Sequence, residues 1–257
     1  MSTKYKAPSV NKAFQILRLI SDNKEGLGIS ELSKGLAIGK STVHGVTSAL
    51  QNVGAIVRDP ATKRFTLGLT LFELGRSAHS RFDLKDVARP FMETLMARTR
   101  TSVFLGIQNH VHVTILDVVE STQDFKITSP IGTTIPLMAG AVGKVFLASM
   151  EEVRAIQLIR SKGITQYTAN TRTDPDDYLE EIRRVRKLNY ATDYEEYIPG
   201  VQAVAAPIQG QAPLRSAIWA VGFKASLDEG AMKRLIAETK KAAESISARI
   251  RAQTGNL

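Results

Sequence analysis

The chain has 257 residues, enough to bury the core of one or two domains, and its 43% hydrophobic and 23% charged residues exclude a wholly disordered protein. No apolar run is long enough for a membrane helix, and the first ten residues lack the apolar stretch of a secretory signal. The absence of cysteine excludes disulfides, thiol chemistry and thiolate metal sites. We therefore expect a cytoplasmic protein with no membrane partner and no cofactor.

The net charge of +9 and the pI of about 9.7 favour an anionic partner. The charge is concentrated near the N-terminus: residues 1–75 hold ten Lys and Arg against five Asp and Glu, a net +5. The other 182 residues therefore carry only +4. This distribution is typical of a nucleic-acid module placed at the N-terminus.

Three segments with helical spacing of apolar residues occupy residues 9–53. Each starts at a serine that we expect to cap the helix: Ser9, Ser30 and Ser41. Gly39 lies in the turn before the third segment, where backbone freedom suits a tight turn, so the order predicts a helix-turn-helix. The residues expected to be buried are Val10, Ala13, Phe14, Leu17 and Ile20, then Leu32 and Leu36, then Val43, Val46, Leu50 and Val53.

The third segment carries short polar side chains opposite its apolar stripe, which suits a recognition helix in a major groove. Strand-like residues 55–58 and 64–67 follow around a turn and predict a basic wing. We expect residues 1–75 to be a winged helix-turn-helix that binds double-stranded DNA; the alternative is a helical subdomain with a solvated polar face. The expected DNA contacts are Ser41, Thr42, His44, Gly45, Ser48 and Asn52 in the helix and Lys63 and Arg64 at the wing tip.

Residues 69–81 and a segment starting at Asp83 indicate helices, so residues 76–100 are expected to link two domains. From residue 101 the pattern changes, with strands expected over 102–108, 111–119, 203–209 and 215–223. Helices are expected within 136–149, from Asp174-Pro175 onward, and over 227–253. Strands and helices interleave irregularly without Gly-x-Gly-x-x-Gly, so residues 101–257 predict an α+β domain rather than a Rossmann sheet.

Several motifs in this order resemble the isocitrate-lyase-regulator (IclR) family of bacterial transcription factors. They are Ser41-Thr42-Val43-His44 and residues 54–58 and 64–68, then residues 135–144, 190–196 and 204–207. The resemblance spans about residues 8–250 and implies a linker helix followed by a GAF-like α/β effector-binding domain. The family often has an arginine directly after the histidine, where this chain has Gly45, so its operator contacts should differ.

The resemblance also implies a ligand pocket in the second domain. Members that bind small oxo acids often have a cysteine and two serines where this chain has Ala203, Ala220 and Gly222. An unpaired polar group on a buried ligand costs about 1–3 kcal/mol, so fewer hydroxyls favour a larger or more apolar acid, such as an aromatic one. Backbone N–H groups near Gly140 are a second means of binding its carboxylate. The implied pocket residues are Leu137, Gly140, Ala141, Val142, Asp193, Val201, Ala203, Ala220 and Gly222.

These observations together predict a ligand-responsive transcription regulator of IclR type. It would control a catabolic operon, bind a palindromic operator as a homodimer or homotetramer, and respond to a small organic acid. Ligand binding would change the arrangement of the paired DNA-binding domains, which requires different affinities for the two arrangements.

Other interpretations of the residues are weaker. Asp193, Glu195 and Glu196 are candidates for the paired carboxylates of a hydrolase, but no second carboxylate cluster with a comparable setting is apparent. His110 and His112 share a strand face but lack the third protein ligand of a metal site. Trp219 is expected in the core rather than against a ligand. We therefore expect no enzyme and no metal, with a small hydrolase and a DNA-architectural protein as the rival classes.

Overall fold

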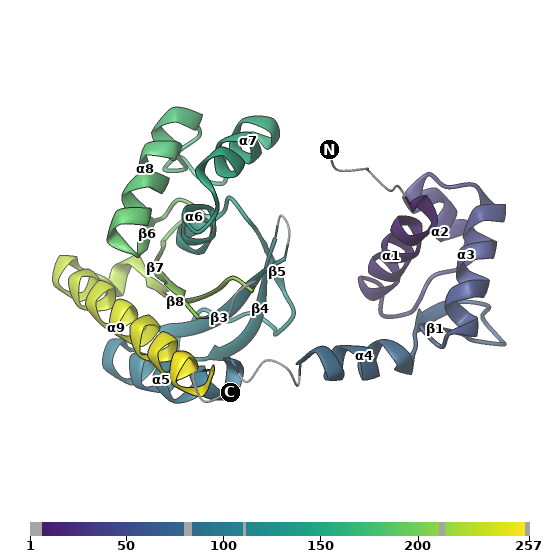
Figure 1. Ribbon diagram of the computed structural model, residues 1–257, viewed down its shortest axis with the longest axis horizontal. Helices are drawn as coiled ribbons and strands as arrows, with labels where there is room; N and C mark the ends of the chain where they lie inside the picture. The colour runs from purple at the N-terminus through teal and green to yellow at the C-terminus, as the bar shows by residue number, and fades with distance from the viewer. Residues whose placement is uncertain (1–6, 80–83, 110–111, 211–213, 255–257) are drawn as a thin grey trace. The chain divides into compact units, whose positions relative to one another are not determined.

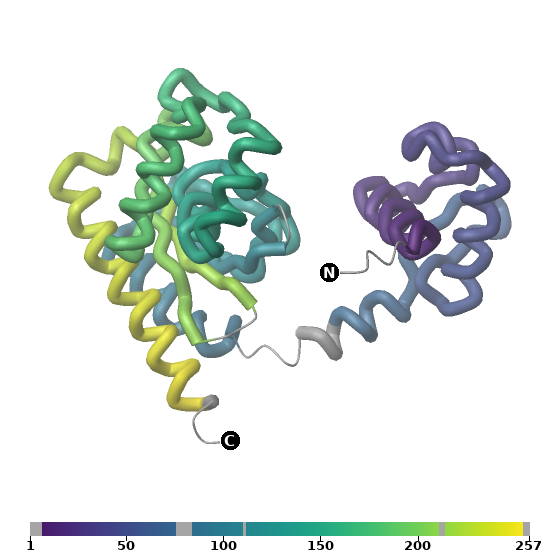
Figure 2. The backbone as a smooth tube through the Cα atoms, turned by 45° about the horizontal axis from the view of Figure 1, so that its top comes forward, coloured from purple at the N-terminus to yellow at the C-terminus, as the bar shows by residue number. Residues whose placement is uncertain are grey.

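The computed structural model describes residues 7–79, 84–109, 112–210 and 214–254. The chain divides into two compact units, Met1–Phe82 and Asp83–Leu257, drawn in Figures 1 and 2. The division lies beyond the predicted boundary at residue 75, because the helix that starts at Leu69 runs to His79. None of the helices in the described parts of the chain is long and apolar enough to cross a membrane.

The first unit is a winged helix-turn-helix, as predicted. The two wing strands pair antiparallel, with Ile56 opposite Leu67, and Phe65 also pairs with Leu27 ahead of the second helix. One apolar core joins all these parts, including Ile16, Leu32 and Val43. Its elements are α1 (Pro8–Ser21), α2 (Ile29–Leu36), α3 (Lys40–Asn52), β1 (Ile56–Arg58), β2 (Phe65–Leu67) and α4 (Leu69–His79).

The predicted serine caps are wrong. Ser9, Ser30 and Ser41 each lie one residue inside their helix, and the cap positions are Ala7, Gly28 and Gly39 with no side-chain cap bond. At α2 the backbone N–H of Gly28 instead donates to Glu31 Oε2 at 2.7 Å. The left-handed residue of the inter-helix turn is Ala37 (φ 52°), not Gly39 (φ −57°). The three helices therefore start without help from a serine hydroxyl.

The buried stripes of α1 and α3 are also shifted from the prediction. Val10 and Phe14 are 53% and 59% exposed, because the core side of α1 runs through Ile16 and Ile20 instead. On α3, Val53 is exposed and Thr47 is buried, its hydroxyl donating to Val43 O at 2.9 Å. A polar residue can occupy this core position because a backbone carbonyl satisfies its hydroxyl.

The second unit is built on an antiparallel six-stranded sheet with the order β5-β4-β3-β8-β7-β6. The sequence does not predict its short strands β5 and β6, nor α7. The elements are α5 (Leu84–Thr99), β3 (Ser102–Asn109), β4 (His112–Val119), β5 (Thr134–Pro136), α6 (Gly140–Ala148), α7 (Glu152–Lys162), α8 (Pro175–Leu188), β6 (Ala191–Tyr194), β7 (Val201–Ile208), β8 (Ser216–Phe223), a 3-10 turn (Lys224–Ser226) and α9 (Glu229–Thr254).

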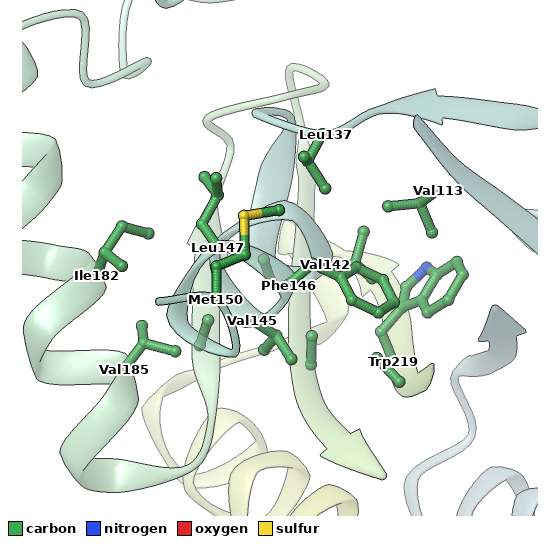
Figure 3. Packing of buried hydrophobic residues seen from close by; sticks show 14 of the residues in the cluster. Val113, Leu137, Val142, Val145, Phe146, Leu147, Met150, Ile182, Val185 and Trp219 are labelled. Carbon is green, nitrogen blue, oxygen red and sulfur yellow. The ribbon is translucent and has the colours of Figure 1, made fainter. Parts of the chain in front are cut away.

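Helices cover both faces of this sheet (Figure 1). The α5 helix, expected in the linker, packs on α9 and the sheet, while α6 and α8 lie on the opposite face. Alternation along the strands gives each face its own core: Trp219 packs with Phe146 under α6, as Figure 3 shows, whereas Ala220 packs with Leu235 of α9. Asp174 caps α8 as predicted, accepting from the N–H groups of residues 176 and 177 at 2.9 Å each.

Candidate DNA surface and effector cavity

The α3 helix presents the predicted polar surface. His44, Gly45 and Ser48 are exposed, and a Cβ built on Gly45 would meet no atom within 4 Å. Gln51, also exposed, adds a hydrogen-bonding side chain that is not among the predicted contacts. Short side chains around an open glycine leave this side of α3 free to approach a groove. Of the other predicted contacts, Ser41 and Asn52 are exposed and Thr42 is half-buried.

The wing tip differs from the prediction in one of its two cations. Lys63 is exposed at the turn, as expected, with a left-handed backbone (φ 58°). The Arg64 side chain turns inward: its Nε donates to the carbonyls of Glu25 and Gly26 at 3.2 and 3.1 Å. Its Nη2 lies 2.9 Å from Glu31 Oε1, so the expectation that this guanidinium projects from the tip is wrong. The Gly28 N–H donates a hydrogen bond to the Glu31 carboxylate, and this bond is the main cause of the lowered pKa of Glu31. Through its pair with Glu31, Arg64 fastens the wing to α2.

A cavity of about 230 Å³ lies in the second unit, between the sheet and the start of α6. Six of the nine predicted pocket residues line it: Gly140, Ala141, Val142, Asp193, Val201 and Ala203. The sequence does not predict the aromatic and hydroxyl-bearing residues of the lining, and one of them, Trp219, is expected in the core rather than against a ligand. These are Phe104, Tyr197 and Trp219, then Thr128, Ser129, Thr133 and Thr134, with Ile115, Ile127, Ile135, Ala139, Ile198 and Val221 completing the walls.

Leu137, Ala220 and Gly222 do not line this cavity. Leu137 is a core residue, and Ala220 faces α5 and α9 because side chains alternate along β8. A Cβ on Gly222 would meet Leu227 at 3.0 Å, away from the cavity. The missing hydroxyls at 220 and 222 therefore carry no information about the ligand. The apolar character of the β8 wall comes instead from Trp219 and Val221.

Trp219 is both a core residue and a cavity wall. Its indole is 4% exposed and stacks on Phe104, with the ring centroids 5.5 Å apart and the planes at 10°. Gly106 makes room for the indole, because a Cβ at that position would lie 2.8 Å from the ring. The aromatic pair therefore gives the cavity a rigid, flat wall.

Asp193 is the buried acid of the cavity. The carboxyl is 5% exposed, and this burial raises its pKa to about 6; the nearby charge of Glu196 raises it as well. A hydrogen bond from the Glu196 backbone N–H to Asp193 Oδ1, at 2.6 Å, acts in the opposite direction. A Cβ on Gly140 would lie 2.8 Å from Asp193 Oδ2, so the acid lies directly against the start of α6.

A buried lysine holds the acid's strand against α6. Lys144 is 1% exposed, and its Nζ lies 2.6 Å from Glu196 Oε1 and 2.9 Å from Thr192 O. Glu195 is bound separately by Lys224 at 2.5 Å. Both glutamates of the hydrolase interpretation are therefore committed to ion pairs. In the sequence, the one indication that Lys144 is buried is its position inside the apolar run 139–148.

In the described residues, no three His, Cys, Asp or Glu side chains lie close enough together to hold an ion. His112 is exposed at the start of β4, and His110 lies outside the described residues.

Comparison with known proteins identifies both units. A family model for the bacterial transcriptional regulator IclR C-terminal domain matches residues 76–248, and one for the IclR helix-turn-helix domain matches residues 9–60. The HTH-type transcriptional regulator BhcR of Paracoccus denitrificans is 32% identical over 200 residues, which cover 78% of this chain and 71% of that protein. The HTH-type transcriptional regulator KdgR of Escherichia coli is 28% identical over 243 residues, covering 94% and 92%.

Solved structures of IclR regulators have the same fold. An IclR transcriptional regulator from Alicyclobacillus acidocaldarius superposes with a TM-score of 0.79 at 26% identity, covering 96% of this chain and 100% of that one. An IclR homologue from Microbacterium hydrocarbonoxydans, complexed with 4-hydroxybenzoate, shares the fold with a TM-score of 0.76 at 20% identity, covering 95% and 99%. Proteins of this kind regulate transcription and are not enzymes, which removes the hydrolase alternative. The chain therefore belongs to the IclR family of DNA-binding bacterial transcriptional regulators.

Proposed function

We propose that this regulator controls a catabolic operon in the cytoplasm in response to an aromatic carboxylic acid bound in the cavity beside α6. The observation that carries the proposal is the combination of a flat aromatic wall, Trp219 on Phe104, with the start of α6 in one small cavity. The wall suits a ring, and the helix start suits a carboxylate.

The size of the cavity supports a single ring. An apolar cavity of about 150 Å³ is enough to hold benzene, and this one measures about 230 Å³. The difference leaves room for a carboxylate and one further substituent. Ile115, Ala203 and Val221 complete apolar walls around the aromatic pair. The Microbacterium hydrocarbonoxydans homologue supports this choice, because the same fold holds 4-hydroxybenzoate there.

The start of α6 is the proposed carboxylate site. The first N–H that bonds within this helix belongs to Gly143, which donates to Ala139 O at 3.3 Å. The N–H groups of Gly140, Ala141 and Val142 precede it, and all three residues line the cavity. Helix starts attract anions through such free donors and through the helix dipole.

The exposed side of α3 is the proposed base-reading surface, with His44 and Ser48 as its central side chains. Lys63 at the wing tip would bind a phosphate without reading sequence. Arg64 is assigned a structural role instead, because its guanidinium already binds α2 and the segment before it.

A second copy of the chain is the proposed partner of the first unit, giving a homodimer or homotetramer. Phe14 on α1 and Leu69 and Phe72 on α4 are at least 59% exposed, although apolar side chains of this size are usually buried. A symmetric pair would cover them and would place two α3 helices on two halves of a palindromic operator.

Intrinsic fluorescence tests the effector assignment, because Trp219 is the only tryptophan and lines the cavity. We expect benzoate and 4-hydroxybenzoate to change its emission with saturation, and Ala203→Phe, which fills the cavity, to abolish the change. Tight binding of only glyoxylate and pyruvate would refute the aromatic assignment. Unchanged binding by the Ala203→Phe variant would show that the ligand lies elsewhere.

A further inference from the structure

A second cavity, of about 510 Å³, lies in the same unit where α5 ends and α9 begins. Its charged lining residues are Arg98, Arg100, Lys126 and Arg234, and none of the described residues that line it is an aspartate or glutamate. This composition differs from that of the effector cavity, whose charged lining residue is Asp193. An excess of one sign in a concave site attracts the opposite charge.

Two of the four cations are already neutralised by neighbours. Arg98 pairs with Glu238 at 3.1 Å, and Lys126 pairs with Glu120 at 2.7 Å. Within the described residues, no carboxylate pairs with the guanidinium groups of Arg100 and Arg234. These two come from different elements, the end of α5 and the second turn of α9, and together they match the charge of a dianion.

The backbone that carries Arg100 is firmly held. Its N–H donates to Met96 O at 2.7 Å, and its carbonyl accepts from the buried hydroxyl of Ser121 at 2.7 Å. The Ser121 N–H donates in turn to the buried Ser102 Oγ at 3.1 Å. Arg100 nevertheless has a left-handed backbone (φ 57°), the conformation that favours glycine after a helix. The fold therefore does not require a side chain at this position.

The walls of this cavity also offer aromatic surface. Phe125 is 85% exposed, and Phe223 is partly exposed at the end of β8. Exposed aromatic side chains beside guanidinium groups suit an anion with a planar body.

We propose that this second cavity binds an organic phosphate, with its phosphate group on Arg100 and Arg234 and its carbon body against Phe125 and Phe223. Two guanidinium groups match a phosphate dianion in charge and in hydrogen-bond geometry. The site is separate from the proposed effector site but shares a wall with it, because Ile127 and Val221 line both cavities. Occupation of one cavity therefore changes the affinity of the other.

Isothermal titration of the full chain with phenyl phosphate tests the site. Losing one charged hydrogen-bond donor weakens binding by about tenfold, so Arg100→Gly and Arg234→Gln should each do so. Arg100→Gly should leave the thermal midpoint no lower than that of the wild type, which separates loss of binding from loss of folding. The matched control is Arg160→Gln, which removes an exposed cation that pairs with Asp176 far from the cavity lining; it should bind like the wild type.

Three further arms separate the possible outcomes. Phenyl phosphate should bind more tightly than inorganic phosphate, and it should still bind the Ala203→Phe variant, whose effector cavity is filled. Benzoate and phenyl phosphate should change each other's affinity by one common factor, about fivefold or more. Failure of benzoate alone would remove the effector proposal and leave this one. No binding of phenyl phosphate, or binding that both arginine variants retain, would overturn the second site and leave Arg100 as a cation that offsets the α5 dipole.

Discussion

The pKa of Asp193 predicts that effector binding depends on pH. Burial raises this pKa from 3.8 to about 6, so the folded protein disfavours the ionised form. The ligand's own carboxylate, bound at the start of α6, would lie beside Asp193, because Asp193 Oδ2 lies directly against Gly140. A protonated Asp193 donates a hydrogen bond to that carboxylate, whereas an ionised one repels it. Binding should therefore weaken as the pH rises through about 6.

The size of the expected change in the ligand Kd follows from the protonated fraction of Asp193. With a pKa of about 6, half of the Asp193 side chains are protonated at pH 6 and about 1% at pH 8. If only the protonated form binds, the apparent Kd rises in proportion to the loss, about 50-fold over this range. The ligand adds no pH dependence of its own here, because a carboxylic acid with a pKa of about 4 stays ionised throughout.

The assay is the Trp219 fluorescence titration with benzoate at several pH values, for the wild type and for Asp193→Asn. The asparagine variant cannot ionise, so its Kd should be nearly constant between about pH 6 and pH 8. A wild-type Kd that stays constant over this range would refute the placement of the ligand carboxylate beside Asp193. An equally steep profile in the variant would assign the titration to another group.

Four further predictions concern individual residues. Gly106→Ala should displace the indole that lies 2.8 Å from the new Cβ, shift the tryptophan emission and cost about 1–3 kcal/mol of stability, measured by chemical denaturation. Ser48→Ala should lower the ratio of specific to random DNA affinity in competition gel shifts, whereas unchanged discrimination would argue against α3 as the reader. Lys63→Ala should weaken all DNA alike and reduce the slope of log K against log salt by about 1. Arg64→Ala should lower the free energy of unfolding of the first unit, because it removes the hydrogen bonds to the Glu25 and Gly26 carbonyls and the ion pair with Glu31; a variant as stable as the wild type would argue against its role in fastening the wing.

The first unit could be predicted largely from local patterns. The order of helix, helix-turn-helix and hairpin depends on periodicity and turn residues, which are local. The caps could not be predicted, because a serine in the first turn of these helices lies only two residues after the cap position. The prediction that Phe14 is buried is wrong, although a large apolar residue at helical spacing usually indicates burial. That rule fails where a partner outside the chain covers the residue, because the sequence pattern is then the same.

The effector cavity shows where prediction from sequence stops. Alternation along β8 shows that Ala220 and Gly222 share one face and that Trp219 and Val221 share the other. It does not show which face meets the cavity, since both faces of this sheet are covered by helices and both are apolar. The predicted lining residues Ala220 and Gly222 are therefore one position away from the observed ones, Trp219 and Val221, and lie on the opposite face of β8. Asp193, on the edge strand β6, is placed in the pocket only by the resemblance to the IclR family, because nothing in the local sequence shows that its carboxyl is buried beside the start of α6.

The most direct test of the account is the effect of benzoate on operator binding by the full chain. The operator is first selected from random DNA by the protein itself, and its Kd is then measured by fluorescence anisotropy with and without benzoate. We predict that benzoate changes the wild-type Kd by about tenfold, within the usual range of coupling between two sites. The Ala203→Phe variant should bind the operator as tightly as the unliganded wild type and should not respond to benzoate. An operator affinity that benzoate leaves unchanged in the wild type, or changes equally in the variant, would contradict control through this cavity.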